Sequence, residues 1–210
     1  MTLLEFSLLA FSSLFVIADP IAVVPGFLAM TPQDTPVQRE RMARLACLVM
    51  AGVLLTFALS GQLIFKLLGI TLPAFQIAGS IVLLLVALDM LRAQRSRVRE
   101  TPEEQEAGTN KVDVAVTPLA IPMLSGPGAI STVVLLRGQA NGFPKTMALC
   151  ACILGVCAAS YVILRLSAKG ARWLNPIAMK ITTRIMGLLL AAVACQFMIN
   201  ALRDLGIVSR

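Results

Sequence analysis

The composition of this chain is that of a membrane protein. It has 210 residues, of which 58% are hydrophobic and 14% are charged, and its mean hydropathy is +0.85. A soluble domain carries about 25% charged residues, so these values exclude an ordinary soluble fold. The chain also has no polar segment long enough to form a second domain. The net charge of +7 does not indicate nucleic-acid binding, because the basic residues cluster beside apolar segments, where loops face anionic lipid.

Six apolar runs are each close to or above the roughly 20 residues that a helix needs to cross a bilayer. They cover residues 3–29, 45–68, 72–91, 114–136, 146–168 and 181–202. The polar stretch 93–113 separates two groups of three runs and is expected to form a cytoplasmic loop. The sequence therefore predicts an all-α integral membrane protein with one transmembrane domain over residues 1–210, divided into a first repeat at 1–92 and a second at 114–210.

The first apolar run is interrupted at Asp19-Pro20 and again at Pro25-Gly26. Proline removes a backbone donor and clashes with the preceding turn, so a helix opens there. Asp followed by Pro is a favoured start for a new helix, which predicts a break of helix 1 near the bilayer midplane. The Asp19 carboxylate can be interpreted in two ways from the sequence, as a helix cap or as a proton or cation site.

The fourth run is interrupted in the same way by Pro-Met-Leu-Ser-Gly-Pro-Gly at residues 122–128. In hydrocarbon such breaks survive only when they are buried in protein or line a wet cavity. The simpler reading is that Pro and Gly only kink packed helices, but two matching breaks favour a binding site. The candidate substrate-binding residues at the two breaks are Asp19, Pro20, Ser125, Gly126, Pro127, Gly128, Ser131 and Thr132.

The two halves of the chain align with each other. Asp19-Pro20-Ile21-Ala22 aligns with Gly126-Pro127-Gly128-Ala129, and Gly79 aligns with Gly187. Because each half holds three spans, the second half enters the membrane from the opposite side, which predicts two inverted three-helix repeats. The N-termini of the two half-helices would then meet near the midplane and offer amides to a small anionic group such as a carboxylate.

Most of the 18 basic residues lie on one side of the predicted spans, which by the positive-inside rule places both termini outside the cytoplasm. The residues on the cytoplasmic side are Arg39, Arg41, Arg44, Arg92, Arg95, Arg97, Arg99, Lys111, Arg165, Lys169, Arg172, Lys180 and Arg184.

The sequence holds no pattern typical of an enzyme or a metal site. It has no His and no C-x-x-C, its five cysteines lie in apolar spans, and no nucleotide-binding motif is present. We therefore expect no catalysis, no cofactor and no metal. Transport would be coupled to H⁺ or Na⁺, with Asp19 as the candidate ion-coupling residue.

Three segments, Asp19–Pro25, Gln76–Leu91 and Val116–Thr132, resemble motifs of the MarC family of bacterial inner-membrane proteins. The resemblance covers essentially the whole chain and implies a six-helix protein of the bacterial inner membrane. The family is similar to archaeal small neutral amino-acid transporters and, distantly, to lysine-exporter-type transporters. Where the family's first motif commonly has Gly-Asn, this chain has Ala22-Val23.

Two functions fit these observations. The first is a secondary transporter of small zwitterions, such as the neutral amino acids Ala or Gly, that works by alternating access of the two repeats. The second is a non-transporting membrane scaffold or stress-linked interaction protein, in which the breaks serve only to pack helices.

The topology gives the first test. A reporter fused after Arg97 is expected to be active in the cytoplasm, and one fused at the C-terminus is expected to be active outside it. The opposite pattern would overturn the orientation and the placement of the repeats together.

Overall fold

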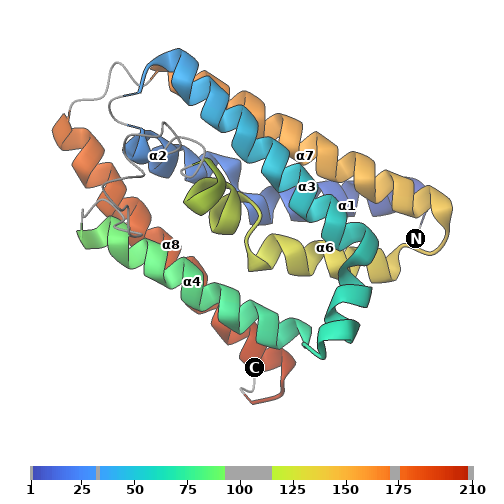
Figure 1. Ribbon diagram of the computed structural model, residues 1–210. Coiled ribbons are helices and arrows are strands. Elements are labelled where there is room, and N and C mark those ends of the chain that lie inside the picture. The colour runs from blue at the N-terminus through green and yellow to red at the C-terminus, as the bar shows by residue number, and fades with distance from the viewer. Residues whose placement is uncertain (1, 32–33, 93–114, 171–175, 208–210) are drawn as a thin grey trace.

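A computed structural model describes residues 2–31, 34–92, 115–170 and 176–207, and within these ranges every regular element is a helix (Figure 1). The all-helical prediction is confirmed for this part of the chain. The expected loop at 93–113 lies outside the described residues.

The first predicted span consists of two helices. Helix α1 (Leu3–Ala18) starts at a capping box, in which the Glu5 amide donates to Thr2 Oγ1 at 3.2 Å and the Thr2 amide donates to Glu5 Oε2 at 2.9 Å. Helix α2 (Pro20–Met30) follows after the single residue Asp19.

The next two predicted spans are single helices. Helix α3 (Pro36–Leu68) starts well before the apolar run that predicted it, because a second capping box at Thr35 and a Pro in its first turn stabilise a polar start. It ends at Gly69, whose φ of 64° is the left-handed conformation typical of a helix C-terminus. Helix α4 (Leu72–Arg92) matches its predicted run closely.

In the second half of the chain, the fourth predicted span is again divided. It consists of a π-helix, η1 (Ala115–Leu124), and helix α6 (Pro127–Gln139). Helices α7 (Phe143–Gly170) and α8 (Pro176–Asp204) complete the fold.

Five segments of the described chain are long and apolar enough to cross a membrane, one fewer than the six predicted. They are Leu3–Leu28, Pro36–Leu68, Leu72–Arg92, Phe143–Ala168 and Arg184–Asp204. The fourth predicted run is absent from this set because η1 and α6, with 10 and 13 residues, are each too short to span the hydrocarbon alone.

Corresponding helices of the two halves pack in pairs. Helix α3 lies against α7 and helix α4 lies against α8, while α1, α2, η1 and α6 lie between the two pairs (Figure 1). We call the side of the molecule where α1 begins and α8 ends the terminal end. The side where α2 and α4 end and α3 begins is the loop end.

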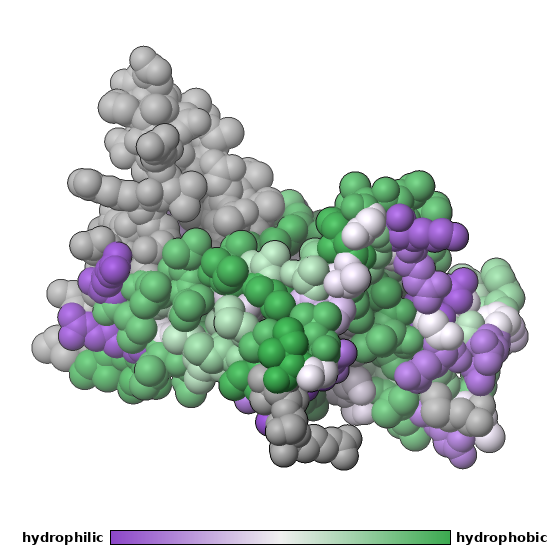
Figure 2. All heavy atoms as spheres, turned by 90° about the horizontal axis from the view of Figure 1, so that it is seen from below, coloured by the Kyte–Doolittle hydropathy of each residue, from purple (hydrophilic) through white to green (hydrophobic). Residues whose placement is uncertain are grey.

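The surface is largely apolar. Leucines such as Leu67, Leu154 and Leu188 are more than half exposed. The face in Figure 2 is green across its middle, with purple concentrated toward its two sides. A band of exposed apolar side chains between polar ends is the surface that a bilayer requires.

The α4–α8 pair depends on close backbone contact. A Cβ atom added to Gly187 would lie 2.9 Å from both the Ala87 carbonyl oxygen and the Leu91 amide nitrogen, which are backbone atoms that cannot turn aside. By contrast, a Cβ added to Gly52 of α3 would meet nothing within 4 Å. The first glycine is required by packing, and the second is not.

These two glycines form a matched test. Gly187→Ala is expected to lower stability by about 1–3 kcal/mol, because the added methyl overpacks the α4–α8 contact. Gly52→Ala is expected to leave stability unchanged or to raise it by up to about 1 kcal/mol, because alanine favours helix. Thermal denaturation of the detergent-solubilised protein measures both, and equal effects of the two substitutions would contradict the close contact.

Candidate functional site

Asp19 ends one helix and starts the next. Its φ of 35° is left-handed, and its amide donates to the Phe15 carbonyl at 3.0 Å, which closes the last turn of α1. Its carboxylate accepts the Ala22 amide at 3.1 Å, which caps α2, and Pro20 fills the first position of α2. The carboxylate therefore occupies the N-terminus of α2, so this helix start is already neutralised by the chain itself.

The opposite end of α2 is fixed by a buried arginine. Arg39 of α3 is 6% exposed, and its Nε and Nη2 donate to the Thr31 carbonyl at 3.0 and 2.7 Å. The sequence placed Arg39 in a loop, whereas it lies in the first turns of α3 and holds the C-terminus of α2. Both ends of this half-helix are thus held by specific hydrogen bonds.

The second break is built differently. The Ser125 amide and hydroxyl both donate to the Ala120 carbonyl at 2.8 Å, so Ser125 closes η1. Helix α6 starts with Gly126 in an extended conformation, and no side chain caps it. The first amides of α6, at Gly128 and Ala129, therefore receive no side-chain cap. The start of α6 keeps its partial positive charge.

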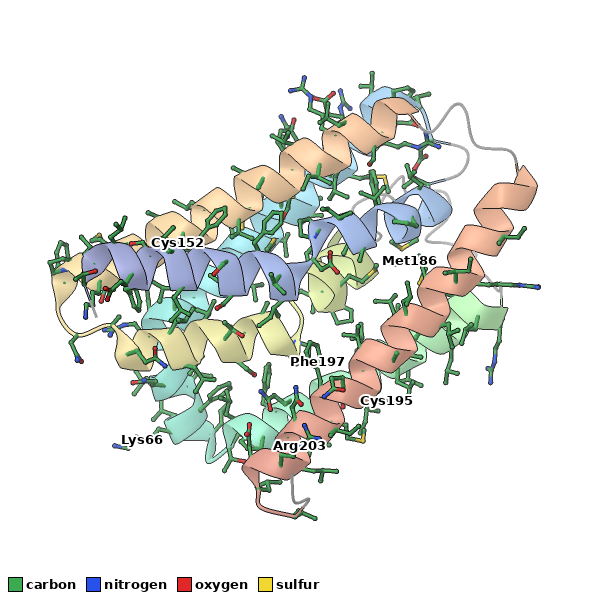
Figure 3. The ribbon with its side chains drawn as sticks, turned by 180° about the vertical axis from the view of Figure 1, so that it is seen from behind. Lys66, Cys152, Met186, Cys195, Phe197 and Arg203 are labelled. Atoms are coloured by element: carbon green, nitrogen blue, oxygen red, sulfur yellow. The ribbon has the colours of Figure 1, made fainter. Side chains whose placement is uncertain are left out.

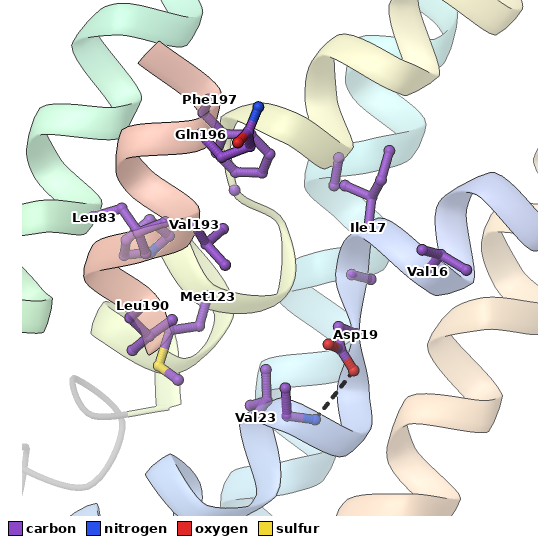
Figure 4. A pocket seen from close by; sticks show the side chains of 15 residues that line it. Val16, Ile17, Asp19, Val23, Leu83, Met123, Leu190, Val193, Gln196 and Phe197 are labelled. Atoms are coloured by element: carbon purple, nitrogen blue, oxygen red, sulfur yellow. Dashed lines mark hydrogen bonds between the residues drawn. The ribbon is translucent and has the colours of Figure 1, made fainter. Parts of the chain in front are cut away.

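The two breaks line one cavity of about 280 Å³. Asp19 and Ala22 face it from the first break, Gly126 and Ala129 from the second, and Phe197 from α8 (Figure 4). The full lining is Val16, Ile17, Ala18, Asp19, Ala22, Val23, Leu83, Pro122, Met123, Gly126, Ala129, Leu190, Val193, Gln196 and Phe197. Residues about a hundred positions apart in the sequence therefore meet around one space.

Two of the lining side chains are polar, those of Asp19 and Gln196. Asp19 is exposed, and Gln196 donates from Nε2 to Asn200 Oδ1 at 2.8 Å, a bond within α8. The rest of the lining is aliphatic or aromatic apart from the backbone at the two breaks. Such a cavity suits a small molecule with few polar groups, held by a small number of directed contacts.

A second cavity of about 280 Å³ lies at the same break. Ser125 and Pro127 line it together with Phe75 and Gly79 of α4. Pro122 and Gly126 line both cavities, so both cavities adjoin the short turn 122–126. Two of the predicted site residues, Ser125 and Pro127, thus face the second cavity rather than the first.

Four other predicted residues are not part of the lining of the first cavity. Pro20 is buried at the start of α2, and Thr132 donates its hydroxyl to the Gly128 carbonyl at 2.8 Å. Ser131 is 2% exposed, and its Oγ has no hydrogen-bond partner within the described chain. Pro20 belongs to the first break and Gly128, Ser131 and Thr132 to the second, but none of the four lines the cavity at Asp19.

Gly128 and Gly126 lack side chains for reasons of packing. The Phe197 ring lies where a Cβ of Gly128 would be, and the Pro122 carbonyl oxygen lies where a Cβ of Gly126 would be. Both glycines were predicted from the sequence to be substrate-binding residues, and the structure gives each of them a packing role. The bare face of Gly128 is covered by Phe197, whereas Gly126 does line the cavity.

Gln196, Phe197 and Leu83 were not among the residues predicted from the sequence to form the site. Nothing in the local sequence marks Phe197 or Leu83, because their place in the cavity results from how α4 and α8 pack on the breaks. Gln196 does carry a signal, because its amide stands in an otherwise apolar stretch of α8.

A charged cluster joins α3 and α7 away from the cavity. Arg165 Nε lies 2.8 Å from Glu40 Oε1, and the Tyr161 hydroxyl donates to the same oxygen at 3.1 Å. Arg165, counted above among the basic residues on the cytoplasmic side, lies within α7. The ion pair links α3 to α7. Because both side chains are substantially exposed, it contributes little to stability.

Comparison with known proteins identifies the family. The model of the MarC family of integral membrane proteins matches residues 4–205. The chain belongs to the MarC family. It is therefore an integral multi-pass membrane protein, as its several apolar helices indicate.

Relatives of this MarC protein occur in archaea and bacteria. It is 35% identical to a UPF0056 membrane protein of Methanocaldococcus jannaschii, over 95% of this chain and 97% of the relative. It is 37% identical to the UPF0056 membrane protein YvbG of Bacillus subtilis over 88% of each chain, and 27% identical to YhcE of Escherichia coli over 93% of this chain and 91% of that protein. No solved structure matches the chain.

The cap at Asp19 generates a stability test. Asp19→Asn is expected to leave stability within about 0.5 kcal/mol of the parent, because Asn caps helices as well as Asp and tolerates a left-handed φ. Asp19→Ala is expected to cost about 0.5–2 kcal/mol, because the Ala22 amide loses its acceptor. The measurement is thermal denaturation in detergent, with Asp204→Ala at the exposed end of α8 as control. An unchanged Asp19→Ala would show that the cap is not needed.

Proposed function

We propose that this MarC protein is a secondary transporter of small neutral amino acids or similar zwitterions, working by alternating access. The observation that carries the proposal is that both helix breaks line one cavity, with a carboxylate at one break and an uncapped helix start at the other. A free amino acid presents an ammonium and a carboxylate at its two ends, and these two features complement that pair of charges.

The chemistry of each contact is specific. The Asp19 carboxylate would attract the substrate ammonium, and Ala129, which lines the cavity from the first turn of α6, would offer its amide to the substrate carboxylate. Gly126 lines the same cavity at the start of α6. The aliphatic lining favours a substrate with a small apolar side chain, because a larger polar one would be buried there without hydrogen-bond partners.

An inverted repeat supplies the mechanism. We propose six membrane crossings in two inverted halves, with η1 and α6 together forming the fourth crossing. The pairing of α3 with α7 and of α4 with α8 supports this, because symmetry-related helices of such repeats pack around a shared centre. Rocking of the halves against each other would expose the cavity to one side of the membrane and then to the other.

Location and energy source complete the proposal. The distribution of basic residues supports a bacterial inner membrane protein with both termini in the periplasm. Coupling to H⁺ or Na⁺ through Asp19 is proposed because, among the described residues, it is the one carboxylate that lines the cavity. No catalytic step, cofactor or resident metal enters this mechanism, and its partners are lipid, a zwitterion and the coupling ion.

Uptake by purified protein in proteoliposomes tests the function. Labelled Ala or Gly is expected to accumulate saturably under an H⁺ or a Na⁺ gradient. Asp19→Asn keeps the cap but removes the charge, so its uptake should no longer follow the gradient while the protein remains as stable as the parent.

The matched control is Asp204→Asn, which removes the same charge at the exposed end of α8 and should leave coupled uptake intact. Absence of saturable uptake under every gradient would instead favour the scaffold function. Normal coupling in Asp19→Asn would restrict Asp19 to its role as a cap.

A further inference from the structure

The two ends of the first cavity differ. Toward the terminal end, its lining includes Val16, which is 71% exposed, and the exposed Gln196. In Figure 4, Gln196, Phe197 and Ile17 lie at one end of the cavity, and Val23, Met123 and Leu190 lie at the opposite end. That second end faces the loop end of the molecule and is formed by buried or half-buried apolar side chains.

At this end of the cavity, the Met123 side chain packs against Gly26 of α2. A Cβ added to Gly26 of α2 would lie 2.9 Å from the Met123 methyl carbon and 3.5 Å from that of Met90. Both methyl groups therefore rest against the bare backbone of Gly26. Met123 is 7% exposed and Met90 is 8% exposed, so the two side chains fill the space between η1, α2 and α4.

A third methionine lies at the same level. Gly187 of α8 packs against Ala87 and Leu91 of α4, so the adjacent residues Met186 and Met90 belong to facing turns of the two helices. Met186, labelled in Figure 3, is 5% exposed. Buried methionines from η1 and α4 thus meet at Gly26, and a third buried methionine, from α8, lies on the turn that faces Met90.

We propose that Met123, seated on Gly26 and Met90, closes the cavity toward the loop end and sets the largest substrate side chain that the cavity admits. This inference rests on the proposed function for its substrate, but not for the closure itself. Met123 is a specificity-determining residue because it lines the cavity, and Gly26 is a positioning residue that acts through it.

The chemistry of methionine suits both tasks. Its unbranched thioether fills irregular space and turns aside at low cost, so it can close the cavity in one state and withdraw in another. A methyl group on Gly26 would push the Met123 methyl away from α2, and the cavity is the open space beside it. A smaller residue at position 123 should therefore raise the size limit for the substrate side chain, and a larger residue at position 26 should lower it.

The first experiment measures binding of a graded ligand series to the purified full-length protein. The probes are alanine, 2-aminobutyrate, norvaline and norleucine, which differ by one methylene each. Met123→Ala should improve the affinity for norleucine relative to alanine at least about tenfold, since one methylene in an apolar pocket changes affinity by about 10–200-fold. Gly26→Ala should lower the affinity for norleucine most and the affinity for alanine least.

Two controls make the result specific. Met147→Ala removes a methionine that is 44% exposed on α7 and should leave the affinity ratios unchanged. Gly26→Ala combined with Met123→Ala should restore binding of the longer ligands, because the methyl group then has nothing to push. Unchanged ratios in both Met123→Ala and Gly26→Ala would overturn the size limit.

A second experiment tests closure without any substrate. Ala22→Cys places a thiol on the cavity wall, and a membrane-impermeant maleimide is applied to either side of sealed vesicles, with labelling of the parent chain subtracted. Labelling is expected to be faster from the terminal end than from the loop end, and the rate from the loop end should rise once Met90→Ala and Met123→Ala are added. Met147→Ala should give no such gain. Equal labelling rates from the two sides in Ala22→Cys alone, or no gain in the combined variant, would overturn the closure.

The two arms separate the inference from the proposed function. If no amino acid binds to or is transported by the parent protein, the proposed function fails while the labelling result still decides the closure. If amino acids are transported but the labelling pattern is the reverse of that expected, the function stands and the closure is wrong.

Discussion

The need to satisfy backbone groups inside an apolar environment governs this structure. Each proline that opens a helix exposes amides and carbonyls that hydrocarbon cannot hydrogen-bond. At the first break the chain meets this need with the Asp19 carboxylate and, at the far end of α2, with Arg39. At the second break Ser125 closes η1, but the start of α6 has no side-chain cap. The two breaks therefore differ in charge, and that difference gives the cavity its polarity.

Close packing holds the second break in place. A Cβ on Gly79 of α4 would lie 2.5 Å from Pro127 Cβ, and the Phe197 ring of α8 covers Gly128. The start of α6 is thus clamped between α4 and α8, and this contact couples the cavity wall to the α4–α8 pair. Glycine is needed at positions 79 and 128 because only a bare backbone lets helices approach this closely.

The sequence predicted much of the fold, because long apolar runs and Pro-Gly interruptions are local signals. It located the breaks at Asp19 and Gly126 to within a residue and predicted that Asp19 could cap a new helix. The further interruption expected at Pro25-Gly26 was wrong, because α2 runs unbroken from Pro20 to Met30 with Pro25 inside it. It did not predict that Ser125 and Pro127 face a different cavity from Asp19, or that Gln196 and Phe197 face the same one. Those facts depend on how helices rotate against each other, and a run of Ala, Leu and Val has too little periodicity to fix a rotation. The buried Arg39 was missed because its partner, the Thr31 carbonyl, is a backbone group that any sequence would supply.

The turn 122–126 has a consequence for inhibition. Pro122 and Gly126 line both cavities, so a shift of this turn would change the shape of both at once. An apolar compound bound beside Gly79 would contact the turn without competing for the Asp19 carboxylate. If the compound altered the affinity of the cavity at Asp19 for a ligand, that ligand would alter the affinity for the compound by the same factor. Under the proposed function, the apolar cavity beside Gly79 is therefore a place where a compound unlike the substrate would modulate transport.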